Sequence, residues 1–209
     1  MPISTTTDLA NMALNMIGAG SIANIDDSSK QAVVCKRFLD MAIRKSLSRG
    51  EFSGSIKRTQ LSLANQWVRQ DYQYQYYLPN DYIKALSMDS LEDFEIEGNY
   101  LYSNEYTHTV TTYDSGTTTT GVTSMPVLIY LAYPTNLNTL QPFVGDYIAA
   151  TLAVMISAEL LNDLSKISLA KTNMQEAYIF AKSANLSEKK GKAVKPTQWS
   201  DYMNNTVVV

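Results

Sequence analysis

Acidic side chains are the residues of this sequence with the clearest capacity for chemistry. Two carboxyl groups a few ångströms apart, one of them holding its proton, are what a glycoside hydrolase requires. Strand alternation would place Glu95 and Glu97 on one face, but a solvated strand face gives the same pattern. Six acids, with no lysine or arginine among them, lie between Met88 and Tyr106: Asp89, Glu92, Asp93, Glu95, Glu97 and Glu105.

Other catalytic and cofactor-binding groups are scarce. The 209 residues include one histidine, His108, and one cysteine, Cys35. These counts exclude a disulfide within the chain, a thiolate zinc site and a metal site with two imidazoles. No glycine-rich phosphate-binding loop of either common spacing is present. We expect no catalytic residue, no cofactor, no metal and hence no enzyme, with His108 exposed in a turn and Cys35 a small buried residue.

Composition and charge are those of an ordinary globular protein. Hydrophobic residues make up 45% of the chain and charged residues 18%, with a net charge of −3. The weak negative charge argues against a protein that coats nucleic acid. The start of the chain does not resemble a signal peptide, and the most apolar stretch, Tyr147 to Ile156, is too short to span a bilayer. We therefore expect no membrane contact and a protein kept in a reducing compartment.

Helical periodicity at both ends of the sequence predicts four helices. The first covers 5–19, with N-cap oxygens before it and glycines after it, and the second follows the cap at 26–29 and ends at Gly50. The third is predicted over 142–160 and the fourth over 165–186. The inward side chains expected of the first and fourth helices are Leu9, Met12, Ala13, Met16 and Ile17, and Ile167, Ala170, Met174, Ala177, Tyr178 and Ala181.

Between residues 52 and 133 the period changes from that of a helix to that of a strand. Tyrosines alternate with glutamines from Tyr72 to Tyr76, and two short runs flank Gly98-Asn99 as in a hairpin. A further strand is predicted over 127–133. The threonine-rich stretch 107–124 has almost no large aliphatic residue and is predicted to be a long, mobile loop or hairpin tip.

These patterns predict an α+β fold. Two N-terminal and two C-terminal helices would form a helical bundle, an antiparallel β module would be inserted between the pairs, and an extended tail would follow. The corresponding domains are 1–52 with 140–187 for the bundle, 53–139 for the β domain and 188–209 for the C-terminal tail. No helix of this kind can bury its apolar stripe alone, so the two pairs are expected to close on each other.

The order and spacing of several short motifs resemble the head-to-tail adaptor proteins of short-tailed phages, a family also called tail tubular protein A. The resemblance covers about residues 5–186, and one departure is Glu51-Phe52, where relatives often carry a Trp-Phe pair. The motifs are the run Leu9–Gly18, Ile25-Asp26-Asp27, Phe38-Leu39-Asp40 with Arg44, Leu61, Tyr76–Tyr82, Phe94–Tyr102, Ile129–Tyr133, Pro142-Phe143 and Leu152-Ala153.

The resemblance implies a structural virion protein. Twelve copies would form a ring beneath the portal protein, join it to the tail nozzle protein and leave an axial channel for the genome. DNA would pass through this channel during ejection without sequence-specific binding. The protein would be made in the host cytoplasm and reside in the neck of the virion. In such a ring the acids Glu92, Glu95 and Glu97 are candidate channel-facing residues that would keep DNA from adhering.

The C-terminal tail carries the candidate partner-binding residues. Aromatic and methionine side chains on an extended tail are typical docking anchors for a portal or a neighbouring subunit, although they could also pack on the chain's own core. The lysines before them could contact a partner or simply solubilise the tail. The residues of this predicted site are Trp199, Tyr202, Met203, Lys189 and Lys190.

Several alternatives stay open. The chain could be a cell-wall glycan hydrolase that uses its strand carboxylates, or a different phage connector such as a stopper or nozzle component. The tyrosines from Tyr72 to Tyr77 could form a stacking platform for bases or sugars, but sheet core and subunit interface are the favoured roles.

Overall fold

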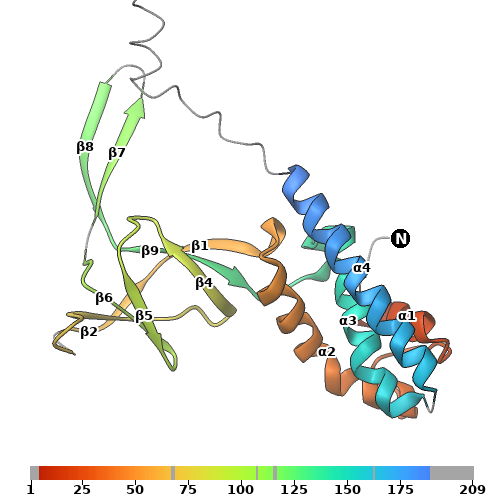
Figure 1. The fold of residues 1–209 in the computed structure, drawn as a ribbon. Coiled ribbons are helices and arrows are strands. Elements are labelled where there is room, and N and C mark those ends of the chain that lie inside the picture. Colours follow the sequence, from red (N-terminus) through yellow and green to blue (C-terminus); the bar gives the residue numbers. More distant parts are fainter. Residues whose placement is uncertain (1–4, 67–68, 107, 115–116, 162, 189–209) are drawn as a thin grey trace, which may run out of the picture.

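A computed structural model describes residues 5–66, 69–106, 108–114, 117–161 and 163–188 of the chain. Helices lie at both ends of this region and strands lie between them (Figure 1). The four helices and antiparallel sheets confirm the α+β class. The tail residues 189–209, which include the predicted docking anchors, lie outside the described residues.

Helices α1 (Thr6–Ile17) and α2 (Lys30–Gly50) begin and end where the capping residues predict. Thr5 accepts a hydrogen bond from the Asp8 backbone, and Gly18 ends α1 in the left-handed region with φ 67°. Ser29 caps α2 through the backbone N–H of Ala32. Between the helices, the Asn11 side chain both donates to and accepts from the backbone of Ile22, which fixes the connecting loop against α1.

Helix α3 (Pro142–Leu160) lies among the other three helices. It contacts α1, α2 and α4 (Leu164–Glu188), and this explains why its buried residues cover almost its whole circumference. By length and composition α3 could cross a membrane, with a mean hydropathy of 1.5. The apolar stretch Tyr147 to Ile156 is thus the middle of a longer apolar helix. In the described structure α3 is a core helix, and 61% of its most apolar 18-residue stretch is buried.

The strands form two packed sheets and a separate ribbon, all antiparallel. One sheet has the order β1-β9-β4 and the other β2-β3-β6-β5, while β7 and β8 pair with each other. The bounds are β1 Ile56–Gln60, β2 Ser62–Gln66, β3 Tyr74–Tyr77, β4 Tyr82–Met88, β5 Phe94–Glu97, β6 Tyr100–Ser103, β7 His108–Asp114, β8 Thr117–Ser124 and β9 Val127–Ala132.

Two hydrophobic cores hold these elements. The larger is built from the four helices together with Phe52, and the smaller from side chains of both sheets, among them Tyr76, Leu101 and Leu128. Phe52, which stands in the motif with the departure noted above, is fully buried and packs edge-to-face on Phe143 and Tyr147. It therefore anchors the end of α2 to α3.

Polar contacts join the end of α4 to both points where the chain crosses between helices and strands. Asn185, only 3% exposed, accepts hydrogen bonds of 2.9 Å from the backbone N–H and the hydroxyl of Ser53. Ser53 lies in the short helix η1 (Ser53–Ser55) before β1, and its hydroxyl also accepts from Gln141 at the start of α3. Gln141 in turn donates to Glu188. The second short helix, η2 (Leu137–Thr139), lies between β9 and α3.

Two local expectations were wrong. Met16 is 36% exposed, because the buried face of α1 is instead formed by Leu9, Ala10, Ala13, Leu14 and Ile17. His108 begins strand β7 and does not lie in a turn. The threonine-rich stretch, predicted to be either a loop or a hairpin tip, is the paired β7–β8 hairpin, in keeping with the β-propensity of threonine.

Candidate functional site

The strand acids are not isolated from cations, because Arg69 reaches them from the turn between β2 and β3. Its guanidinium forms ion pairs with Asp71 at 2.7 Å, with Glu95 at 3.2 Å and with Glu97 at 2.8 Å. The guanidinium also lies over the Tyr102 ring, 5.3 Å from its centroid. Glu92, in the segment before β5, is exposed and is not a partner of Arg69.

The electrostatics of this cluster follow from its geometry. The hydrogen bond to Asp71, together with the charges of the three carboxylates, raises the pKa of Arg69. Desolvation opposes ionisation of Asp71, but backbone hydrogen bonds and Arg69 outweigh it and lower the pKa of that carboxyl. Three carboxyl groups surround one guanidinium, so the cluster contains more acidic than basic side chains.

The Leu78–Tyr82 turn, one of the motifs of the resemblance, has a structural role. Asp81 accepts a hydrogen bond from the Tyr130 hydroxyl at 2.8 Å and pairs with Lys57 at 2.6 Å, which ties β4 to β9 and β1. Desolvation opposes ionisation of Asp81, but the hydrogen bonds from Lys57 and Tyr130 prevail and lower its pKa. Burial, followed by the hydrogen bond to Asp81, raises the pKa of Tyr130.

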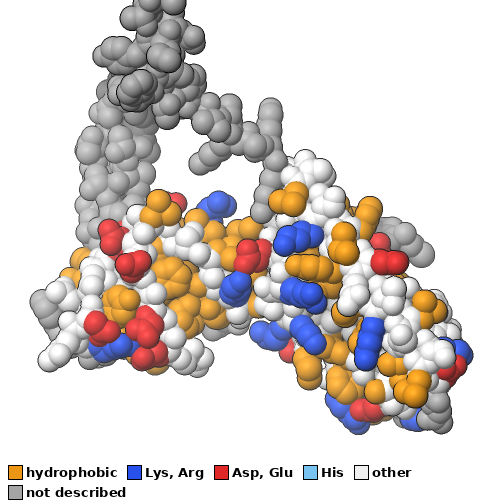
Figure 2. Space-filling view, viewed as in Figure 1, with side chains coloured by type: hydrophobic (Ala, Val, Ile, Leu, Met, Phe, Trp, Pro, Cys, Tyr) orange, Lys and Arg blue, Asp and Glu red, His pale blue; other side chains and the backbone are white. Residues whose placement is uncertain are grey.

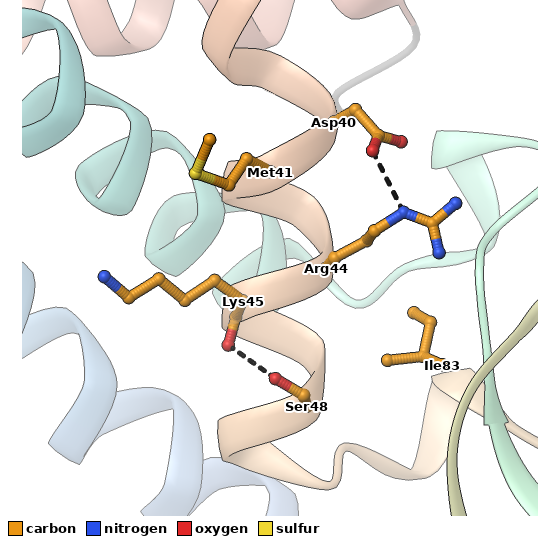
Figure 3. A pocket seen from close by; sticks show the side chains of 6 residues that line it. All are labelled: Asp40, Met41, Arg44, Lys45, Ser48 and Ile83. Carbon is orange, nitrogen blue, oxygen red and sulfur yellow. Dashed lines mark hydrogen bonds and ion pairs between the residues drawn. The ribbon is translucent and has the colours of Figure 1, made fainter. Parts of the chain in front are cut away.

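An open groove of about 540 Å³ lies between the outer side of α2 and strand β4 (Figure 3). Met41 and Lys45 point to one side of α2, whereas Asp40 and Arg44 point to the other, toward Ile83. Arg44 pairs with Asp40 at 2.9 Å and lies 4.9 Å from the Tyr133 ring centroid. The groove thus combines the apolar side chains of Met41 and Ile83 with two cations, and one of these, Arg44, is already paired with Asp40.

Helix α4 has large apolar side chains on the side that faces away from α3. A helix that is apolar on two sides is normally buried on both. Figure 2 shows hydrophobic and basic side chains together over the helices, whereas acidic side chains gather on the sheets. The exposed apolar residues of α4 are Leu164, Leu169, Ile179, Phe180 and Leu186, which are 57–83% exposed.

The structure brings together some of the predicted site residues. Glu95 and Glu97 share one face of β5, as strand alternation predicts. Cys35 is fully buried, and burial raises its pKa to about 11. Within the described residues no group of three or more His, Cys, Asp or Glu side chains is placed to hold a metal ion.

Sequence reasoning missed Arg69 and the two helical surfaces. Arg69 lies outside the acidic run, and its partners Glu95 and Glu97 follow more than twenty residues later, so only the strand order brings them together. The outer row of α4 could have been predicted from the spacing of its apolar residues in the sequence. Leu169, Ile179 and Leu186 fall outside the predicted inward set and recur at helical spacing.

No protein-family model and no curated protein matches this chain significantly.

Proposed function

We propose that the chain is a ring-forming head-to-tail adaptor of a short-tailed phage, which joins the portal protein to the tail nozzle protein and forms part of the DNA channel. The proposal includes the finer fold prediction, in which the four helices act as a bundle, the β module is inserted and the tail extends to a partner. Its role is structural and uses no catalytic residue. Twelve copies are the number that the family resemblance implies.

One observation carries the proposal. The helices from the two ends of the chain share one core, and α4 still presents a long apolar side outside that core. An exposed apolar row on a helix needs a partner, and a connector made of identical copies supplies one at every subunit. The motifs that resemble the adaptor family contribute to the same construction. The Leu78–Tyr82 turn ties three strands through Asp81, and Phe52 anchors α2 to α3.

The acidic surface supports a channel role better than a hydrolytic one. A glycoside hydrolase needs a protonated carboxyl in an enclosed, apolar cleft. Glu95 and Glu97 instead lie on an exposed strand face and pair with Arg69. A negative, solvated surface of this kind repels phosphate groups, and this favours free passage of DNA.

The experiment is deletion of the gene from the phage that encodes it, followed by electron microscopy of the particles. We expect DNA-filled heads without tails, and recovery of complete particles when the chain is supplied from a plasmid. As a control, the plasmid-borne variant Glu95→Gln with Glu97→Gln should restore tailed particles, because no catalysis is required. Tailed, infectious particles formed without the chain would contradict the proposal, and loss of wall lysis alone would favour the hydrolase.

A further inference from the structure

The outer side of α4 carries positions spaced alternately by three and four residues. Residues at this spacing share one face of a helix, and this is the pattern of a seam between two packed helices. We call this row the α4 stripe: Leu169, Thr172, Glu176, Ile179, Ser183 and Leu186. All six are exposed, and Ile179 is 67% exposed. Within the described part of the chain the stripe is therefore uncovered, and its spacing suits a helix as partner.

A second row with similar spacing lies on the outer side of α2. We call it the α2 stripe: Val33, Arg37, Met41, Arg44 and Ser48. Val33 is 45% exposed and Met41 is 52% exposed, so both apolar side chains of this row are open to solvent. The groove described above runs beside this stripe. Two uncovered helical rows thus occur on one chain, on different helices.

The charges of the two stripes are opposite. Glu176 is the one acidic residue of the α4 stripe, whereas the α2 groove carries two cations, Lys45 and Arg44, and the latter pairs with Asp40. Among the residues described by the structure, neither Glu176 nor Lys45 forms an ion pair. The carboxylate of Glu176 can therefore pair with the ammonium group of Lys45 when the two surfaces meet.

We infer that α4 of one copy packs antiparallel against α2 of a second copy and lays the α4 stripe along the α2 stripe. This inference rests on the proposed function, which requires repeated contacts between copies, and it specifies the surfaces that make them. The contact is heterologous, because two different surfaces of the same chain meet. Two copies joined in this way still have one free surface of each kind between them, so further copies can add until a ring closes.

The antiparallel direction is set by the positions of the apolar and charged residues. We place Ile179, near the middle of the α4 stripe, opposite Met41, in the middle of the α2 stripe. If the helices run antiparallel, Glu176 then lies opposite the two cations, and Leu186 lies opposite Val33. A parallel arrangement from the same centre would place Glu176 near the half-buried Phe38. The expected pairs are Ile179 with Met41, Glu176 with Arg44 and Lys45, and Leu186 with Val33.

Disulfide cross-linking between two differently tagged forms of the full chain tests the register. We expect a mixed covalent dimer from Met41→Cys with Ile179→Cys and from Val33→Cys with Leu186→Cys, at the highest attainable concentration. The same four variants recombined give the control, since Met41→Cys with Leu186→Cys would be about 10 Å out of register along the helix. A disulfide needs Cα atoms within about 7 Å, so this pair should not link. All four positions are exposed, so the variants should fold.

Charge reversal gives a second measurement. Glu176→Lys and Lys45→Glu should each weaken association by about tenfold, and mixing the two variants should restore it at the mixed interface. Lys30→Glu, the same change at the start of α2, should have little effect. Equal linking of all cysteine pairs, absence of links, or failure of the mixed rescue would overturn this inference and leave the adaptor proposal standing. Tailed particles formed without the chain would overturn the adaptor proposal whatever the register.

Discussion

The substitution Phe52→Ala should remove the aromatic contacts that hold the end of α2 against α3, and it should strongly destabilise the protein. Phe52 is fully buried, and burial of such a side chain contributes about 1.5–3 kcal/mol. It also makes edge-to-face contacts with Phe143 at 6.5 Å and Tyr147 at 6.0 Å, each worth about 0.5–1.5 kcal/mol. These contributions agree with the roughly 3–5 kcal/mol measured for Phe→Ala in protein cores, and we expect a loss of about 4 kcal/mol.

Urea denaturation followed by circular dichroism at 222 nm measures this loss in the free energy of unfolding. The matched control is Phe180→Ala, the same change at a residue that is 64% exposed on α4. We expect this control to alter the free energy of unfolding by less than about 0.5 kcal/mol. The assignment of Phe52 as the anchor would be refuted by a loss below about 1.5 kcal/mol, or by equal losses at the two positions.

Three further outcomes follow from the structure. A Cβ on Gly50 would overlap the buried Phe52 ring, so Gly50→Ala should cost at least about 1–3 kcal/mol in thermal or urea denaturation; an unchanged midpoint would contradict this packing. Because the pKa of Asp81 is lowered in the folded protein, its ionised carboxylate stabilises the fold at pH values above the ordinary aspartate pKa. This stabilisation is lost as the pH falls through the pKa of the folded state. Asp81→Asn should therefore lower the urea midpoint at pH 7 more than at pH 3, and equal shifts would count against this role. Burial raises the pKa of Cys35 to about 11, so a thiol reagent at pH 8 should react with the native protein far more slowly than with the urea-unfolded chain; similar rates would show that the thiol is accessible.

The helices could be predicted closely because their signals are local. Ser29 and Gly18 mark helix boundaries within one turn, and apolar spacing defines the buried sides. The Gly98-Asn99 hairpin was equally local, with Gly98 at φ 59° in the first turn position. Strands β1 and β4 were not predicted individually, because their polar and apolar residues do not alternate cleanly. Their place beside β9 is set by tertiary pairing.

The candidate site was less predictable than the fold. Six acids without a cation suggested a bare negative run, but Arg69 enters from another strand connection and pairs with two of them. This arrangement depends on the strand order β2-β3-β6-β5, which no local pattern encodes. The lack of large aliphatic residues in the threonine-rich stretch allows either a loop or a hairpin tip. The β-branched threonines favour extended backbone, and β7 pairs with β8 in a hairpin.

The hydrogen bonds around Ser53 have a mechanical consequence. Ser53, Gln141 and Asn185 fasten three distant parts of the chain at one point: the exit from α2, the entry to α3 and the last turns of α4. A load applied beyond Glu188 would reach both helix–strand crossings at once instead of unwinding α4 from its free end. Under tension the helices and sheets would then move together as one body. In a force–extension measurement, the hydrogen bonds at Ser53 would break late.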